Sequence, residues 1–401
     1  MAVMTEWFCT ICYHEQETEK ETPEFCAQCG GGSASIISLA EQSGGAKGAN
    51  VSGPIENLDQ VRDRARIKLK GICAVYPYCD GNSDRICQRE AYGKPIGLGG
   101  AGSGASFAAN LTALTKLRLQ TRLVGDHFEP DPAFSFFDRM LSMPIMGSST
   151  AGISRYNDSM GEVDFCRATI RGCREAGTIA WRGDTWFYTP ENTPALDALE
   201  LEGGYGVPIF KPRAQDTLKG LIERAEKAGC PATGVDIDGC GSTIMARNGQ
   251  PVFRKPIKDL KELVAFTSLP FIAKGIMTPE DAEACVEAGV QVVSVSNHGG
   301  RVLDCTPGVA EVLPAIVERV GKKALITADG GIRTGYDVIK MLALGADAVL
   351  IGRDVIRAAV GGGALGVRLH MERFQTTLKR AMMMTGCPNL SAVNSDILYR
   401  G

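Results

Sequence analysis

Short β-type segments alternate with amphipathic helical segments from about residue 140 onward, and this alternation constrains the fold more than any other feature. Eight segments rich in Val, Ile and Ala have the length and composition of buried parallel strands. Helical patterns separate them, for example at residues 216–229, 278–289 and 334–346. The strand segments begin at Pro144, Thr178, Val207, Thr233, Pro270, Gln291, Lys323 and Asp347.

Eight alternations predict an α/β protein with a closed (β/α)8 barrel, the TIM barrel, and an open doubly wound sheet is the less favoured alternative. Gly follows most of the helical segments, where the last helical turn needs a left-handed residue. In such a barrel the functional site lies where the strands end. The polar residues there are Ser148, Ser149, Thr150, Lys211, Asp236, Asp238, Lys274, Ser296, Asn297, His298, Asp329, Arg333 and Arg353.

The last two strand segments lead into ADGGIRTG and IGRD. In (β/α)8 barrels these two loops often hold a phosphate, with glycine N–H groups and arginine side chains as donors. We expect Gly330, Gly331 and Gly352 to supply backbone donors and Arg333 and Arg353 to supply charge. The alternative is a pair of tight turns with surface arginines.

The sixth strand segment ends in SNHGGR, which places His298 close to Arg301. An imidazole accepts a proton near neutral pH, and a guanidinium holds a carboxylate in a fixed orientation. Lys274, at the end of the fifth strand segment, adds a cation to the same cavity. These three residues predict a site for an anionic ligand, although an isolated His is often structural.

These motifs resemble the FMN-dependent α-hydroxy acid oxidases and dehydrogenases, a family that includes glycolate oxidase and lactate oxidase. The resemblance rests on SNHGGR followed by LD, on AKGIMTPEDAEACVEAG, on ADGGIRTGYDVIKMLALGADAVLIGR and on MMMTGCPNL. It is close over residues 260–393 and weaker back to about residue 118.

The resemblance implies a dehydrogenation of a 2-hydroxy acid. His298 would be the base that takes one hydrogen as a proton, while N5 of FMN receives the other as hydride. Arg301 would bind the substrate carboxylate, and Lys274 would stabilise negative charge at N1 of the reduced flavin. Further implied FMN contacts are Ser149, Thr150, Ala151 and Ser296 at the ring, with Asp329, Gly330, Gly331, Arg333, Gly352 and Arg353 at the ribityl and phosphate groups.

The sequence departs from the family around the substrate. Lys211 stands near the position of a Gln with no Tyr after it, Asp236 replaces a Thr, and the segment before the fifth strand is shortened to about 30 residues. The ordinary pocket for a small hydroxy acid is therefore not expected. Two alternatives are a reductase of a ketone or activated alkene, and an isomerase similar to type 2 isopentenyl diphosphate isomerase, which lacks the His–Arg pair.

Fourteen cysteines are more than a cytoplasmic enzyme of this length needs, and seven of them lie in the first 90 residues. Two CxxC pairs, Cys9 with Cys12 and Cys26 with Cys29, are separated by 13 residues. Four thiolates from two such turns form a tetrahedral metal site. The segment resembles a small rubredoxin, which implies iron that exchanges electrons with FMN. A zinc ribbon that binds a partner protein is the alternative.

The other cysteines give weaker signals. Cys73, Cys79 and Cys87 lie in a loop rich in Pro, Gly and Asp, where they are either iron–sulfur ligands or buried thiols. The remaining seven have no pairing pattern and are interpreted as small apolar residues. They are Cys166, Cys173, Cys230, Cys240, Cys285, Cys305 and Cys387.

Composition divides the chain into four parts. We predict a rubredoxin-like metal domain at 1–38, a flexible linker rich in Gly, Ser and Ala at 39–56, and a helical, Cys-containing extension at 57–140. The extension begins with an amphipathic helix at 57–70. The FMN-binding barrel occupies 141–401.

A net charge of −3 gives no basic surface for nucleic acid or for an anionic membrane. The start MAVMTEWFC lacks a secretory signal, and no stretch reaches the roughly 18 apolar residues of a membrane-spanning helix. We therefore expect a cytoplasmic enzyme whose partners are a 2-hydroxy acid or related carbonyl substrate and a redox protein. The family resemblance implies a homo-oligomer, commonly a tetramer.

Overall fold

The computed structural model describes residues 53–69, 101, 104–156, 158–189 and 191–399, and the backbone of three strands near the N-terminus. The chain divides into two compact units, Met1–Pro54 and Ile55–Gly401. In the first unit, β1 (Thr5–Cys9) pairs antiparallel with β2 (Glu15–Thr18) and β3 (Ile36–Ser38), so that β1 is the central strand.

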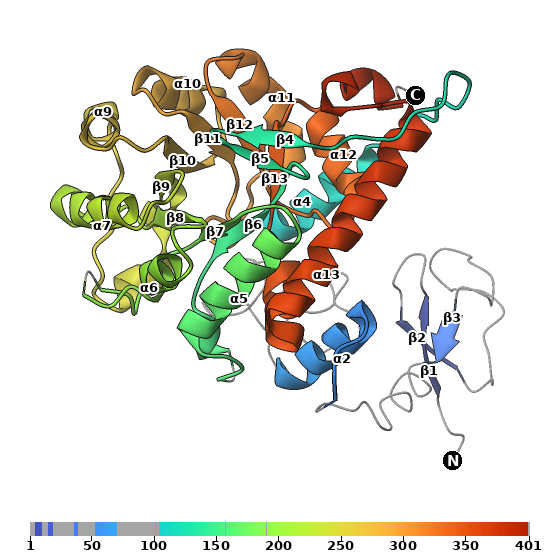
Figure 1. Cartoon of the computed structure of the whole chain (residues 1–401), viewed down its shortest axis with the longest axis horizontal. Helices are drawn as coiled ribbons and strands as arrows, with labels where there is room; N and C mark the ends of the chain where they lie inside the picture. Colours follow the sequence, from blue (N-terminus) through green and yellow to red (C-terminus); the bar gives the residue numbers. More distant parts are fainter. Residues whose placement is uncertain are drawn as a thin grey trace. The chain divides into compact units, whose positions relative to one another are not determined.

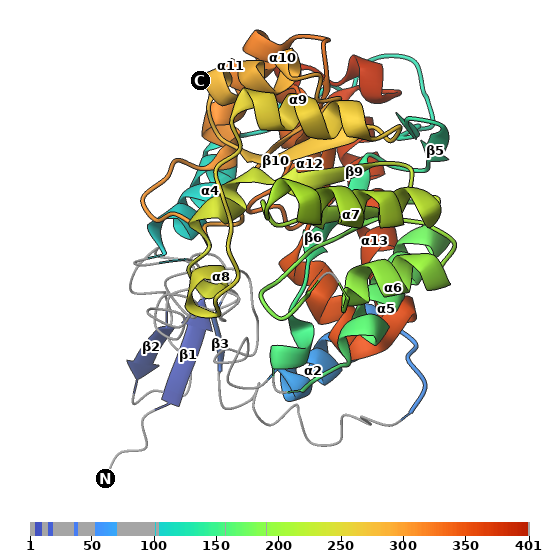
Figure 2. The ribbon, with the colours of Figure 1, turned by 90° about the vertical axis from the view of Figure 1, so that its left-hand side faces the viewer.

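The second unit contains a closed barrel of eight parallel strands, which confirms the predicted TIM barrel (Figures 1 and 2). Each predicted strand segment overlaps one of them. Nearly all their residues are buried, because side chains on one face fill the barrel and those on the other face contact the surrounding helices. The strands are β6 (Ile145–Thr150), β7 (Ala180–Arg182), β8 (Val207–Phe210), β9 (Thr233–Asp236), β10 (Phe271–Ile276), β11 (Val292–Val295), β12 (Leu325–Ala328) and β13 (Ala348–Ile351).

Helices surround the barrel, and the three predicted from clear patterns are present as α7, α10 and α12. Gly177, Gly229, Gly289 and Gly345 have positive φ near the helix ends, as predicted from the glycines that follow the helical segments. The helices are α5 (Glu162–Glu175), α6 (Pro194–Leu201), α7 (Gln215–Lys227), α8 (Thr243–Arg247), α9 (Ile257–Phe266), α10 (Pro279–Glu287), α11 (Val309–Val320), α12 (Gly335–Ala343) and α13 (Arg353–Thr385).

Helix α13 bends at Gly363, where φ is 58°. It packs against α5 and against α2 (Leu58–Lys68), the predicted amphipathic helix of the extension (Figure 1). Helix α4 (Ala105–Lys116) follows and packs against α11. These contacts join the extension to the barrel.

A hairpin closes the N-terminal end of the barrel. Its strands β4 (Phe134–Phe136) and β5 (Arg139–Leu141) place Phe136 and Leu141 against residues at the strand starts, such as Val207. The opposite end, where the strands finish, remains available for a ligand.

The scattered cysteines largely behave as small apolar residues. Five of the seven are buried, whereas Cys240 is half-buried and Cys305 is exposed in the loop before α11. For Cys305 the prediction was wrong, because its thiol lies at an exposed position of this loop and not in the core.

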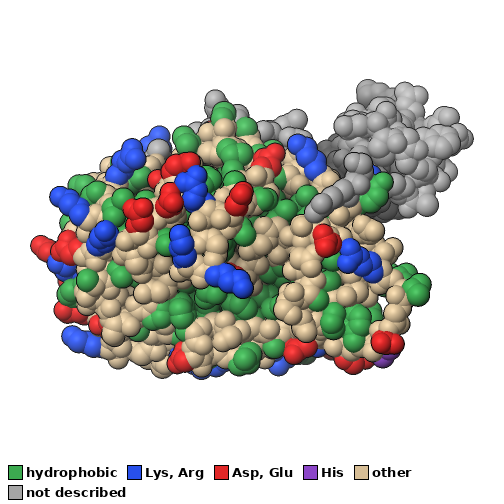
Figure 3. All heavy atoms as spheres, turned by 90° about the horizontal axis from the view of Figure 1, so that it is seen from above, with side chains coloured by type: hydrophobic (Ala, Val, Ile, Leu, Met, Phe, Trp, Pro, Cys, Tyr) green, Lys and Arg blue, Asp and Glu red, His purple; other side chains and the backbone are tan. Residues whose placement is uncertain are grey.

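On the face shown in Figure 3, acidic and basic side chains are interspersed, and neither sign forms a continuous patch over the part of it that is described. This distribution fits the small net charge. Among the residues that the structure describes, no helix combines the length and the apolar character needed to cross a membrane.

Candidate active site

A cavity of about 350 Å³ opens at the C-terminal ends of the barrel strands. Nearly all the site residues predicted in the barrel line it, although they come from five of the eight strands or the loops that follow them. Ser296 differs, since it is fully buried and is not among the lining residues. The predicted residues that line the cavity are Ser149, Thr150, Ala151, Lys274, His298, Arg301, Asp329, Gly330, Gly331, Arg333, Gly352 and Arg353.

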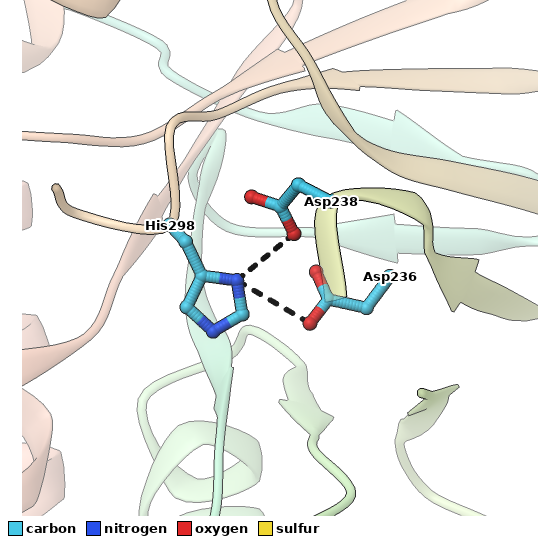
Figure 4. A group of neighbouring side chains, drawn as sticks. All are labelled: Asp236, Asp238 and His298. Atoms are coloured by element: carbon cyan, nitrogen blue, oxygen red, sulfur yellow. Dashed lines mark hydrogen bonds and ion pairs between the residues drawn. The ribbon is translucent and has the colours of Figure 1, made fainter. Parts of the chain in front are cut away.

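His298 contacts two carboxylates. Its Nδ1 lies 3.0 Å from Oδ1 of Asp238 and 3.4 Å from Oδ2 of Asp236 (Figure 4). An ionised carboxylate only accepts hydrogen bonds, so in the neutral ring these partners assign the proton to Nδ1 and leave Nε2 as the acceptor. Figure 4 shows Nε2 turned away from both carboxylates.

The backbone at His298 is held in the left-handed region, with φ at 58°. This conformation is uncommon for a residue other than glycine and needs support from its surroundings. The N–H of His298 donates to Oγ of Ser296 at 3.0 Å, and the N–H of Gly300 donates to Oδ1 of Asn297 at 3.1 Å. A side chain on Gly300 would place its Cβ 2.5 Å from the backbone nitrogen of Phe107, so only glycine fits there.

Asp236 joins two lysines inside the barrel. Lys211 Nζ donates to Oδ2 at 2.7 Å, and Lys274 Nζ donates to Oδ1 at 3.1 Å. Lys274 and Asp236 are direct partners in the register of β10 and β9, which places both side chains on the same face. All three side chains are buried.

The charges around Asp236 determine its ionisation. Burial alone would raise its pKa, but His298, Lys211 and Lys274 together hold that pKa well below the usual value. Burial would lower the pKa of Lys274, yet Asp236, Asp238 and Asp329 raise it above the usual range. Asp236 is therefore an anion and Lys274 a cation at neutral pH.

Asp236, Asp238 and His298 are close enough together to hold a metal ion. Two ammonium groups already bind Asp236, however, and they would repel a divalent cation at this position. The arrangement therefore suits a histidine base with carboxylate partners better than a metal centre.

Ser296 connects Lys274 to Asp329 behind the cavity. Its hydroxyl accepts from Lys274 at 3.3 Å and donates to Oδ2 of Asp329 at 2.9 Å. Oδ1 of Asp329 and Oγ1 of Thr150 are buried and have no hydrogen-bond partner among the described residues. Buried polar atoms are rarely unpaired in native proteins, and these two lie on residues that line the cavity, so they offer partners to polar groups of a ligand.

The loops after β12 and β13, in which the phosphate cradle is predicted, both line the cavity. A Cβ on Gly352 would meet only Ser148 and Thr150, both at 3.7 Å, so at this position the backbone borders open space. Arg353 is fixed by donation to the carbonyl of Gly299 at 2.9 Å and by stacking at 4.4 Å on the ring of Phe107. A phosphate would meet backbone donors, guanidinium charge and the start of α13 here.

Two buried polar pairs were not found from the sequence. Asn110 of α4 donates to Oδ1 of Asn297 at 2.8 Å and so fixes the loop that carries His298. Arg213 binds Asp184 through two hydrogen bonds of 2.8 and 2.9 Å beneath the cavity wall. Both pairs join residues far apart in the chain, and a single sequence carries no signal for such contacts.

The family model for FMN-dependent dehydrogenases matches residues 97–258 and 243–400. The chain belongs to the FMN-dependent dehydrogenase family. It is an FMN-dependent oxidoreductase of the 2-hydroxy acid oxidase and dehydrogenase type. The match begins at residue 97, so the N-terminal cysteine-rich segments lie outside it.

Among relatives of this family member, 2-hydroxyacid oxidase 1 of Homo sapiens is 30% identical over 346 residues, which cover 75% of this chain and 90% of the human protein. The L-lactate dehydrogenase of Ectopseudomonas mendocina (strain ymp) is 30% identical over 362 residues, covering 75% of this chain and 93% of that enzyme.

Solved structures of mandelate oxidase are similar to this family member. One variant, in complex with 2-hydroxy-phenylacetamide, has a TM-score of 0.68 at 28% identity, and the match covers 86% of this chain and 98% of that one. Another variant carries a monooxide FMN adduct and has a TM-score of 0.63 at 30% identity, covering 75% and 93%.

The residues of the cavity fit FMN, the cofactor of the family. The unpaired oxygens of Asp329 and Thr150 offer partners to polar groups of the cofactor, and the cradle at Gly352 offers space for its phosphate. The two predicted cysteine clusters of the N-terminal part lie almost wholly outside the described residues. Only the backbone of Cys9 is placed; the others are Cys12, Cys26, Cys29, Cys73, Cys79 and Cys87.

Proposed function

We propose that the protein oxidises a 2-hydroxy acid to the corresponding 2-oxo acid, with His298 as the base and Arg301 as the carboxylate ligand. The observation that carries this proposal is the orientation of His298. Its Nδ1 is held by Asp238 and Asp236, and its Nε2 is left as an acceptor at a cavity that suits FMN.

His298 Nε2 takes the proton of the substrate hydroxyl, and the imidazolium that forms is stabilised by the two carboxylates at Nδ1. Arg301, on the same loop, orients the substrate carboxylate through paired N–H donors. FMN, when bound, would accept the C2 hydrogen together with the two electrons of its bond, as hydride. Lys274 supplies positive charge at the flavin, and Asp236 keeps that lysine protonated and in place.

For the cofactor, we propose that Ser149, Thr150, Ala151, Lys274 and Ser296 surround the flavin ring, with Ser296 acting from behind Lys274. Asp329, Gly330, Gly331, Arg333, Gly352 and Arg353 would hold the ribityl and phosphate groups.

Replacing Arg301 with Lys tests this function, because Lys keeps the charge and loses the paired donors. We expect kcat/KM for 2-hydroxy acids to fall about 10- to 100-fold, with FMN content unchanged. The measurement is steady-state formation of the 2-oxo acid with an artificial electron acceptor. Arg254→Lys is a matched control, since Arg254 is exposed and does not line the cavity.

Two outcomes would contradict the proposal. Full activity of Arg301→Lys on an isoprenoid diphosphate, with no 2-oxo acid formed by the wild type, would favour the isomerase alternative. If reduced FMN is reoxidised by a ketone or activated alkene while no 2-hydroxy acid reduces it, the reductase alternative is correct.

We further propose that the N-terminal unit is a rubredoxin-like module in which Cys9, Cys12, Cys26 and Cys29 bind iron, which accepts single electrons from FMN and passes them to a redox protein. The CxxC spacing and the small antiparallel sheet, whose central strand ends at Cys9, support this proposal. The proposed domains are 1–38, 39–56, 57–140 and 141–401, in a homo-oligomer that by family resemblance is a tetramer.

Metal analysis of the purified protein tests the module. We expect about one iron per chain and visible absorption from an Fe(III)–thiolate centre, both lost in Cys9→Ser while the FMN content stays the same. The control is Cys240→Ser, at a half-buried thiol of the barrel. If the protein contains one zinc per chain and no iron, the module is a zinc ribbon and has no electron-transfer role.

A further inference from the structure

The cavity is lined by more positive than negative side chains. Seven of its lining residues are Lys or Arg, and four are Asp. This excess contrasts with the mixed charges of the outer face in Figure 3. The lining residues concerned are Arg155, Lys211, Arg247, Lys274, Arg301, Arg333 and Arg353, with Asp184, Asp236, Asp329 and Asp354.

Most of these charges already have a partner or a role. Asp184 and Asp354 are bound by Arg213 and Arg357, neither of which lines the cavity. Lys211 and Lys274 share Asp236. The proposed function uses the charges of Arg301 for the substrate carboxylate and of Arg333 and Arg353 for the cofactor phosphate. Arg155 and Arg247 are then the cations of the lining without an assigned role.

Arg155 and Arg247 come from different loops. Arg155 ends the short 3-10 helix η2 (Ile153–Arg155) after β6, and Arg247 ends α8 after β9. Both side chains are exposed, and neither has a hydrogen bond or carboxylate partner among the residues that the structure describes. Their charge is therefore available to an anion in the cavity.

Aromatic rings fix the position of Arg155. Its guanidinium carbon lies 5.1 Å from the ring centre of Trp186 and 5.2 Å from that of Phe187, within the range of cation–π attraction. Trp186 lines the cavity as well, and the two rings pack edge to face. A guanidinium held against rings loses little entropy when its N–H groups bind an anion.

We propose that the substrate carries a second anionic group, a carboxylate or a phosphate, and that Arg155 binds it with the help of Arg247. This inference rests on the proposed function, because the first carboxylate is the one assigned to Arg301. The substrate class is thus a 2-hydroxy acid with an anionic group at its far end. Lys211 and Asp236, which replace the Gln and Thr of the family, agree with a pocket altered from that for a small hydroxy acid.

The test compares substrates with one and two anionic groups on the FMN-loaded enzyme. Lactate has one carboxylate, malate has two, and phosphoglycerate has a carboxylate and a phosphate, so the panel also separates the two kinds of second anion. We expect kcat/KM for malate or phosphoglycerate to exceed that for lactate. Arg155→Gln should lower kcat/KM for the dianionic substrates about 10- to 100-fold and leave kcat/KM for lactate unchanged. Arg247→Gln should lower kcat/KM for the dianionic substrates by a smaller factor. Arg254→Gln, outside the cavity, is the control.

A binding measurement makes the test independent of turnover. Succinate and propionate resemble malate and lactate but have no hydroxyl to oxidise, and their binding is followed by the change in flavin absorption. Arg155→Gln should raise the Kd of succinate and leave that of propionate unchanged. Added salt should weaken the binding of succinate more strongly than that of propionate, because salt screens the exposed charges of the arginines.

Three results with the Arg155→Gln variant would overturn the inference. They are equal effects of Arg155→Gln on succinate and propionate, no effect on either, or loss of FMN from the variant, which would assign Arg155 to the cofactor. If lactate reduces the flavin but no dianionic substrate does so better, the inference fails and the proposed function stands. If no 2-hydroxy acid reduces it, the proposed function fails, and selective succinate binding would still show a site for two anionic groups.

Discussion

Replacing His298 with Asn is expected to lower kcat/KM for 2-hydroxy acid oxidation by about 10²- to 10⁴-fold, the usual contribution of a general base. Asn adopts the left-handed conformation more readily than most residues, so the φ of 58° at this position can be retained. The loss of rate would then report the missing imidazole and not a disturbed loop. Steady-state formation of the 2-oxo acid measures the effect.

Two controls separate chemistry from folding. FMN content should be unchanged in His298→Asn, because the residues assigned to the phosphate and ribityl groups are untouched. His127→Asn changes an exposed histidine outside the cavity and should have wild-type activity. A His298→Asn variant with full activity would remove His298 from the mechanism.

Of the substitutions considered, Asp236→Leu is expected to lower the free energy of unfolding most. The substitution removes the carboxylate that two buried lysines share, and an unpaired buried charge lowers the free energy of unfolding by about 3–5 kcal/mol. In the variant, Lys274 keeps Asp329 and Asp238 as electrostatic partners. Lys211 loses Asp236, the carboxylate with which it forms an ion pair. Lys211 should therefore account for much of the loss.

A double variant tests that explanation. Asp236→Leu combined with Lys211→Met removes both charges of the pair, so it should be more stable than Asp236→Leu alone. Thermal unfolding of the FMN-loaded proteins, followed by circular dichroism, measures the differences. An Asp236→Leu protein with the wild-type midpoint would show that the ion pairs do not stabilise the barrel.

The direction in which the pKa of Asp236 is shifted determines the pH at which thermal unfolding should be measured. The pKa of Asp236 is held well below the ordinary 3.8 in the folded protein. A lowered pKa adds stability that is complete above the ordinary value and is lost as the pH falls through the lowered one. Near neutral pH, unfolding therefore reports the full contribution of the ionised carboxylate.

The barrel could be predicted from the sequence because its signals are local. Strands buried on both faces are short apolar runs, and glycines of positive φ follow the helices between them. Helix α4 and the β4–β5 hairpin were not predicted. The first starts directly after the glycine-dense residues 97–104, and each hairpin strand has only three residues.

The site could be predicted only in part, because only some of its signals are local in the sequence. His298, Arg301 and Lys274 lie in motifs at strand ends, and these motifs together with the family resemblance led to their prediction; all three line the cavity. The contact between His298 and Asp238 joins residues 60 positions apart and depends on how β9, β10 and β11 align in the barrel. The stacking of Arg155 on Trp186 likewise depends on the path of two neighbouring loops.

Anaerobic mixing of the FMN-loaded enzyme with a 2-hydroxy acid tests the central claim most directly. The proposed function predicts that flavin absorption disappears, that one 2-oxo acid forms per flavin reduced, and that His298→Asn slows this single turnover while dithionite still reduces the variant. If no 2-hydroxy acid, with one or two anionic groups, reduces a flavin that dithionite reduces, the assignment of His298 and Arg301 to this reaction is wrong.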